Sequence, residues 1–206
     1  MPLKPSYQTI KIEREGGITW TILNRPEKRN AISPQLCFDM EDALMALETD
    51  EETKVIVLTG AGPAFSAGMD LKEYFRANDQ NPDGQFRAYN ANKHWQWEIL
   101  SMMRKPTIAM VNGFCFGGAF TPLVGCDLAI AADEARFGLS EVNWGILPGG
   151  IVSKVAQMTM SHRDALFYSM TGRSFSGSSV HGSVCHSFRN TTTRNWRETS
   201  SLPPIA

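Results

Sequence analysis

Short apolar segments alternate with helix-like segments along most of this chain, and this alternation restricts the possible folds more than any other feature. The predicted strands are residues 8–14, 18–23, 54–60, 107–113 and 127–132. The first two are joined by a glycine pair, and the last three are continuous apolar runs, typical of strands covered on both faces. Strands interleaved with helices predict an α/β fold.

The predicted helices fill the gaps between these strands. Ser33-Pro34 indicates a helix start, with a hydroxyl N-cap followed by proline, and apolar residues then recur at helical spacing to Leu47. Residues 86–103, 151–160 and 163–170 are also predicted to be helical. A further helix is expected to begin at the glycines of FGGAFTPLVG and to end near Gly125.

Composition excludes several classes of partner. The chain has 206 residues, with 20 Lys and Arg against 21 Asp and Glu, so no charge excess attracts nucleic acid or a membrane surface. No apolar run approaches the ~20 residues of a membrane span, and the N-terminus lacks a signal-peptide core. The four cysteines are scattered, which is typical of reduced thiols, and we expect a cytoplasmic protein.

The chain divides into two parts by composition. Residues 1–175 carry the alternating pattern, whereas residues 176–206 are rich in serine and threonine and have little apolar periodicity. We expect the second part to be a poorly ordered tail.

Two glycine-containing loops follow predicted buried strands. In SAGMDLKEYF, Met69 stands between Gly68 and Asp70 at a predicted helix start, and in NGFCFGGAF, Gly118 stands at another. N–H groups at helix starts lack partners, and two of them converging on one carbonyl would form an oxyanion hole. Glycine loops after strands are more often simple tight turns, so spacing alone leaves both interpretations open.

Other site motifs are missing from the sequence. It contains no G-x-x-x-x-G-K-[ST] loop, no complete dinucleotide fingerprint and no G-x-S-x-G elbow. The four histidines show no metal-ligand spacing, and we expect no metal and no cofactor.

Three polar side chains are candidates for a site. Glu141 lies among apolar residues beside Trp144, and burial would raise its pKa into the range useful for proton transfer. An exposed loop glutamate is the alternative. Lys28 and Arg29 could contact phosphates or belong to a solvated basic loop.

Taken together, NRPEKRNAI, VLTGAGPAFSAGMDLKEY, KPTIAMVNGFCFGGAF, CDLAIAAD and FGLSEVNWGILPGG resemble the crotonase (enoyl-CoA hydratase/isomerase) family. This resemblance implies a β–β–α spiral core that binds a coenzyme A thioester as substrate. It also implies that Met69 and Gly118 are the oxyanion donors and that Glu141 is catalytic. The positions at which the family contacts the substrate are Lys28, Arg29, Ala31, Ala67, Asp70 and Leu71.

One position departs from the family pattern. Typical enoyl-CoA hydratases have a second glutamate where this chain has Thr121, and a threonine hydroxyl is no carboxylate base. The sequence is most similar to the hydroxycinnamoyl-CoA hydratase-lyase subfamily, which has serine at the position of Thr121. That subfamily hydrates and cleaves 4-hydroxycinnamoyl-CoA or feruloyl-CoA to an aromatic aldehyde and acetyl-CoA. We expect Thr121 near the reacting atoms, Tyr74 at the phenol and Trp144 in the substrate site.

Two other functions remain open on the sequence. One is a different single-glutamate reaction, such as enoyl-CoA isomerisation or hydration, and the other is an impaired CoA-binding protein. The resemblance implies a homotrimer or hexamer. It fades after TGRSFSG, so we expect the family's C-terminal helical part to be truncated or replaced by an altered or out-of-frame sequence.

Overall fold

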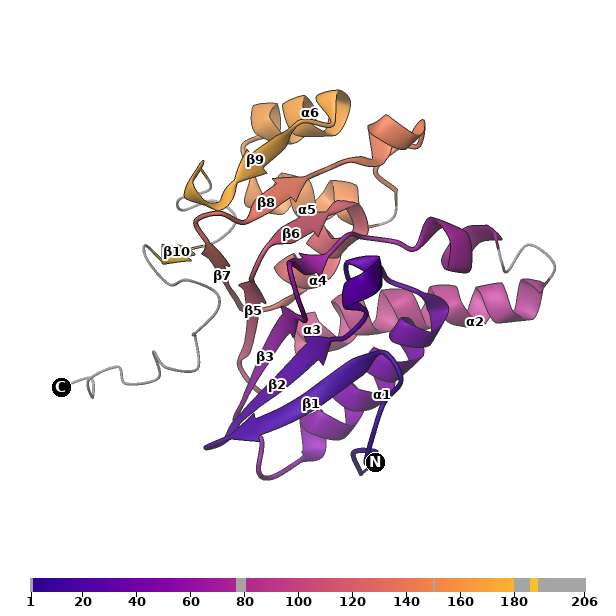
Figure 1. Ribbon diagram of the computed structural model, residues 1–206, viewed down its shortest axis with the longest axis vertical. Coiled ribbons are helices and arrows are strands. Elements are labelled where there is room, and N and C mark those ends of the chain that lie inside the picture. Colours follow the sequence, from indigo (N-terminus) through magenta and orange to yellow (C-terminus); the bar gives the residue numbers. More distant parts are fainter. Residues whose placement is uncertain (1, 77–80, 150, 180–185, 189–206) are drawn as a thin grey trace.

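The computed structural model describes residues 2–76, 81–149, 151–179 and 186–188 and contains two sheets (Figure 1). The larger sheet has the spatial order β1 (Ile10–Glu15), β2 (Ile18–Leu23), β3 (Val55–Gly60), β5 (Thr107–Val111), β7 (Leu128–Ala132) and β10 (His186–Phe188). β1 and β2 form an antiparallel hairpin, and all later neighbours pair in parallel. Five of the six strands are those predicted from the sequence, and the α/β class is confirmed.

The strands of the smaller sheet were not predicted from the sequence. It contains β4 (Ala64–Ser66), β6 (Phe114–Phe116), β8 (Arg136–Gly138) and β9 (Ser174–Ser176), in that order. Each strand has three residues, too few to show an alternating pattern. The first three pair in parallel, and each follows a strand of the larger sheet after a short turn. The chain therefore winds as a repeated β–β–α unit, which confirms the expected crotonase-like core.

The helices complete these units. Their bounds are η1 (Pro26–Lys28), α1 (Pro34–Thr49), η2 (Leu71–Arg76), α2 (Pro82–Lys93), η3 (His94–Ile99), α3 (Leu100–Met102), η4 (Gly117–Ala119), α4 (Phe120–Gly125), η5 (Glu141–Trp144), α5 (Val152–Thr159), α6 (His162–Thr171) and η6 (Gly177–Ser179). α1 starts as predicted, because the Ser33 hydroxyl accepts a hydrogen bond from the Leu36 N–H at 3.2 Å. In the described part of the chain, no helix has the length and apolar character needed to cross a bilayer.

Two parts of the Ser/Thr-rich tail are placed beside the core. Ser176 ends β9, and β10 pairs with β7. Gly177–Ser179 form η6, and residues 180–185 and 189–206, and with them the expected poor order and altered C-terminal part, lie outside the described residues.

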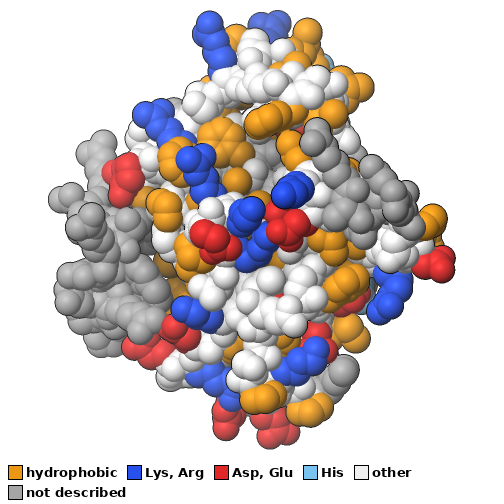
Figure 2. Space-filling view, turned by 45° about the vertical axis from the view of Figure 1, so that its right-hand side comes forward, with side chains coloured by type: hydrophobic (Ala, Val, Ile, Leu, Met, Phe, Trp, Pro, Cys, Tyr) orange, Lys and Arg blue, Asp and Glu red, His pale blue; other side chains and the backbone are white. Residues whose placement is uncertain are grey.

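The end of the molecule that carries α5 and α6 exposes apolar side chains. Figure 2 shows hydrophobic side chains near the top of one face, the end at which Figure 1 places these helices. Leu166, Phe167 and Met170 of α6 and Met158 of α5 are each about half exposed or more. The inner face of α1 is fully buried instead, with Leu36, Met40 and Leu44 at most 1% exposed.

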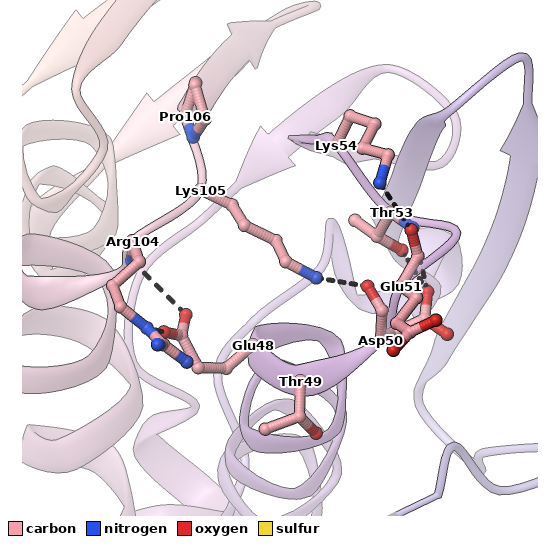
Figure 3. A pocket seen from close by; sticks show the side chains of 9 residues that line it. All are labelled: Glu48, Thr49, Asp50, Glu51, Thr53, Lys54, Arg104, Lys105 and Pro106. Carbon is pink, nitrogen blue, oxygen red and sulfur yellow. Dashed lines mark hydrogen bonds and ion pairs between the residues drawn. The ribbon is translucent and has the colours of Figure 1, made fainter.

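A hollow of about 500 Å³ at the end of α1 is lined by residues that cap this helix (Figure 3). Lys105 donates to the carbonyls of Leu47 and Asp50, which end the helix. Arg104 pairs with Glu48. Lys105 satisfies carbonyls at the negative end of the helix dipole, and the hollow borders the residues that precede β3 and β5. It therefore lies at the sheet edge opposite the glycine loops, which follow the strands.

The loop between β2 and α1 is attached to the loop after β3 by one buried amide. The Asn30 side-chain Nδ2 donates to the carbonyls of Ala61 and Ala64 at 2.9 and 2.7 Å, and its Oδ1 accepts from the Arg25 N–H at 2.8 Å. Asn30 is fully buried and has a left-handed backbone (φ 55°), a conformation that asparagine tolerates better than most residues.

A second attachment joins the loop between β2 and α1 to the segment after β4 through charge. The buried Arg25 guanidinium contacts Asp70 at 3.2 Å and Glu73 at 2.7 Å, and it also donates to the Ala31 carbonyl at 2.6 Å. Removing one partner from a buried ion pair leaves an uncompensated charge, which is costly. Asn30 and Arg25 thus determine how the two loops lie against each other.

We expect Asn30→Ala to lower the free energy of unfolding by about 2–4 kcal/mol, because three buried hydrogen bonds are lost and alanine is strained at positive φ. Asn30→Gly removes the strain but not the lost bonds, and should recover about 1 kcal/mol. Urea unfolding measures both, with the exposed helical Asn90→Ala as a control within about 0.5 kcal/mol of wild type. Equal stability of all three variants would show that Asn30 is no attachment point.

Candidate active site

The two glycine loops that the sequence singled out meet in the structure. A Cβ atom built on Gly118 would lie 3.6 Å from the Met69 nitrogen and 3.1 Å from its Cγ. A Cβ on Gly68 would lie 3.1 Å from the Gly118 nitrogen and 2.6 Å from the Phe116 carbonyl oxygen. Gly68 also has φ 85°, so both its backbone angle and its contacts require glycine. Residues that are 49 positions apart, Met69 and Gly118, thus place their backbones side by side.

The backbone pairing around Met69 leaves its N–H on the side away from Ile32. Ile32 forms a parallel bridge with Met69, in which the Ile32 N–H donates to Gly68 and the Ile32 carbonyl accepts from Asp70. In a parallel bridge the central residue uses neither of its own polar groups, so the Met69 N–H is directed away from Ile32. Gly118 lies in the first turn of η4, where the N–H groups have no partner within the helix. The two donors are therefore available to a ligand.

Glu141 lies beside the glycine that precedes Gly118. A Cβ on Gly117 would be 3.2 Å from Glu141 Oε1, and Gly117 has φ 53°. Both the close contact and the left-handed backbone disfavour a side chain at this position. Glu141 is only 9% exposed, and among the described residues its Oε2 has no hydrogen-bond partner. Burial raises the pKa of Glu141, since desolvation disfavours the charged carboxylate.

Met69, Gly118 and Glu141 occupy equivalent places in three successive β–β–α units. Each follows a strand of the smaller sheet by two or three residues: Met69 follows β4, Gly118 follows β6, and Glu141 follows β8. Because these strands are parallel neighbours, their carboxyl ends meet at one edge. The topology therefore brings a carboxyl group and two N–H donors to one place.

The burial of Glu141 has a different cause from the one expected. The apolar residues that follow it in sequence face solvent, with Trp144 68% and Leu147 84% exposed, whereas Leu139, which precedes it, is fully buried. Glu141 is instead covered by the Gly117 loop of the neighbouring unit. Thr121, at 5% exposure, is buried in the first turn of α4.

The predicted substrate-contact residues fall into two groups. Lys28, Arg29, Ala67 and Leu71 are exposed on the attached loops, and Ala31 is half-buried. Asp70 is buried and accepts hydrogen bonds from the N–H groups of Lys72 and Glu73 at 3.2 and 2.9 Å, in addition to its pairing with Arg25. Asp70 therefore organises the first turn of η2 in this structure.

Tyr74 belongs to the core rather than to the surface. It is 6% exposed, and burial raises the pKa of its hydroxyl, with Cys37 of α1 and Tyr89 of α2 contributing. Its ring packs edge-on against Phe75, with centroids 5.2 Å apart. The predicted contact of Tyr74 with a phenol remains a prediction.

Three residues of the site were missed by sequence reasoning. Gly117, Asn30 and Arg25 position the groups above without themselves resembling catalytic residues. The only sequence signal was the glycine pair at 117–118 and the polar run NRPEKRN, both of which are common in loops. In the described part of the chain, no three His, Cys, Asp or Glu residues are grouped to hold a metal ion.

Comparison with known proteins agrees with this architecture. The sequence profile of the enoyl-CoA hydratase/isomerase family matches residues 13–182. Hydroxycinnamoyl-CoA hydratase-lyase of Pseudomonas fluorescens is 59% identical over 172 residues, which are 83% of this chain and 62% of the relative. 4-Chlorobenzoyl coenzyme A dehalogenase-2 of Arthrobacter sp. is 34% identical over 164 residues, 80% of this chain and 59% of that protein. The chain thus spans about three fifths of the length of these relatives.

Solved structures extend the agreement to three dimensions. The crystal structure of an enoyl-CoA hydratase from Shewanella pealeana superposes with a TM-score of 0.79 at 27% identity, covering 90% of this chain and 69% of that one. The family profile, the relatives and the spiral of β–β–α units lead to the same assignment. This chain belongs to the enoyl-CoA hydratase/isomerase family, also known as the crotonase family.

Proposed function

We propose that this chain binds a hydroxycinnamoyl-CoA thioester, adds water to it and cleaves the product to an aromatic aldehyde and acetyl-CoA. The observation that carries the proposal is the junction of Met69, Gly118 and Glu141, at which two N–H donors adjoin one buried carboxyl group. The 59% identity to a hydroxycinnamoyl-CoA hydratase-lyase supports this choice of reaction within a family that also contains a dehalogenase. A shared fold alone would not support it.

In the proposed hydration step, the Glu141 carboxylate removes a proton from water as the water oxygen bonds to the β-carbon. The electron pair of the double bond moves to the thioester oxygen, which the Met69 and Gly118 N–H groups stabilise. Glu141 then returns the proton to the α-carbon. One carboxyl group can serve both transfers, provided that its pKa lies near neutrality, and burial shifts it in that direction.

In the proposed cleavage step, Glu141 removes the proton of the β-hydroxyl group. The bond between the α- and β-carbons breaks, its electron pair again forms an enolate held by the two N–H groups, and the aldehyde is released. Glu141 then protonates the α-carbon to give acetyl-CoA. The same three groups therefore act in both steps.

A para-hydroxyl group on the substrate explains how a single carboxyl group suffices. The para-phenolate donates electrons through the ring and stabilises the positive charge that develops at the β-carbon in a quinone-methide-like state, so a second acid is not required. Thr121, buried in α4 where other hydratases have a glutamate, could donate or accept a hydrogen bond but could not act as a carboxylate. No cofactor is needed, because coenzyme A is part of the substrate.

Feruloyl-CoA tests the reaction class directly. Incubation with the purified chain should yield vanillin and acetyl-CoA in equal amounts, as measured by chromatography. Conversion of a 3-enoyl-CoA to its 2-enoyl isomer, without aldehyde from feruloyl-CoA, would contradict the proposed reaction and favour a single-glutamate isomerase.

Glu141→Gln should lower kcat about 10²–10⁴-fold with little change in KM, because the amide fills the same space but transfers no proton. The matched control is Glu134→Gln, an exposed glutamate just before β8, which should keep kcat within about twofold of wild type. Similar kcat values for the two variants would remove Glu141 from the mechanism.

The raised pKa of Glu141 also predicts two pH effects with opposite signs. The catalytic form is the carboxylate, so kcat/KM should fall as pH drops through a pKa above the usual 4.5 of a glutamate. Stability should change the other way. The folded state holds this proton more tightly than the unfolded state, so Glu141 destabilises the fold at pH values above its folded pKa.

Glu141→Gln should therefore be more stable than wild type at pH 8, and the difference should shrink as pH falls toward 4.5. Urea unfolding at both pH values measures this difference. A constant difference at both values would argue against a shifted Glu141 pKa in the folded protein.

A further inference from the structure

One edge of the larger sheet is formed by β1, and among the described residues no strand pairs with its outer side (Figure 1). The Asn24 N–H donates to the Thr9 carbonyl at 2.8 Å, which continues the antiparallel β1–β2 ladder by one hydrogen-bonded pair. Along such a ladder, hydrogen-bonded pairs alternate with pairs whose backbone groups point outward. The N–H and carbonyl groups of Ile10, Ile12 and Arg14 therefore point away from β2, along the open edge.

This edge is accessible to another strand. β1 contains no proline, and its register with β2 runs without a bulge from Ile10 to Glu15, so two common protections of an edge strand are missing. A hollow of about 480 Å³ borders residues 10–14 and the N-terminal residues 3–7. The Arg14 side chain is engaged elsewhere, since it pairs with Asp50 at the end of α1 at 3.0 Å and with Glu52.

The charges on β1 select one way in which two copies of the strand can pair. The outward backbone groups of two antiparallel copies face each other when the two-fold axis lies at Lys11, Ile12 or Glu13. An axis at Lys11 or at Glu13 sets that residue against its own copy, and like charges directly opposite each other are destabilising. An axis at Ile12 instead sets Lys11 opposite Glu13 at both symmetric positions. Only this register is complementary in charge.

The same register also matches apolar surface. Ile12 is half-buried at the margin of the core, and it lies on the same face of β1 as the buried Ile10. Leu3 and Tyr7 line the adjoining hollow and pack against the core as well. Opposed residues of paired strands lie on one face, so each Ile12 would cover the exposed part of the other.

We propose that β1 is an interface between two copies of this chain, in which the two strands pair antiparallel about a two-fold axis at Ile12. The two larger sheets then form one continuous sheet. An interface of this kind uses the same surface on both copies, so it requires a strand that complements itself, as β1 does. The backbone hydrogen bonds of the added strand supply affinity, and the Lys11–Glu13 pairs supply specificity. The inference is independent of the proposed reaction, because β1 carries no residue of the candidate active site.

Charge reversal tests the register, with sedimentation equilibrium at low ionic strength as the measurement. Lys11→Glu sets carboxylates against each other at both symmetric positions, and Glu13→Lys does the same with ammonium groups. Each variant should associate at least about tenfold more weakly than wild type. An equimolar mixture of the two variants should regain the wild-type affinity, because one strand is then acidic at both positions and the other is basic. The double variant should also regain it.

Hydrogen exchange of single amides, measured by NMR, tests the backbone pairing. In wild type at associating concentrations, the Ile12 and Arg14 amides should exchange slowly, since they bond to the second copy. In Lys11→Glu at the same concentration, both should exchange fast, because they face water. The Glu13 amide points toward β2 and should stay slow in both proteins, which shows that the fold is kept.

The matched control is Lys72→Glu, which makes the same change of charge at an exposed lysine of η2 and should associate as wild type does. A monomeric wild type would overturn the proposal, and so would a mixture of the two single variants that associates no better than either alone. Association that persists in every variant would also overturn it, and would assign the contact to another surface, such as the exposed apolar side chains of α5 and α6.

Discussion

Asn30 donates both side-chain N–H bonds to carbonyls of the loop that follows β3, and the position of Met69 depends on this contact. The amide is fully buried, so these bonds have no competition from water. Hydrogen bonds are directional, whereas the hydrophobic effect is not, so these bonds orient one loop on the other. Arg25 and Asp70 add a second fixed point, between the same β2–α1 loop and the segment that follows β4.

The repetition of the β–β–α unit explains why the site is where it is. Every unit ends its short strand at the same edge, so whatever follows that strand comes close to the equivalent residues of the next unit. Two units contribute a backbone N–H and the third contributes Glu141. Glycine is needed at Gly68 and Gly117 because the three chain segments approach too closely for side chains there. A site that uses backbone donors also tolerates varied neighbours, which suits a family whose members carry out different reactions.

Part of the fold and of the candidate site could be predicted from the sequence, because that part depends on interactions between residues close together in the chain. The strands of the larger sheet are long enough to show their apolar pattern, and Ser33-Pro34 starts α1 by its own chemistry. The glycines at 68 and 118 indicated donors, and the order of motifs indicated the family. The repeated unit was not visible, because its second strand has three residues and its copies share no sequence pattern.

Only the tertiary structure decided how Glu141 is buried. Trp144 and Leu147, which follow it in sequence, face solvent, and a loop 24 positions earlier, at Gly117, covers it instead. The sequence by itself therefore determined which segments form strands and helices and which residues could do chemistry. The tertiary structure decided which of those residues meet, since contacts between distant segments depend on how the sheets are paired and wound.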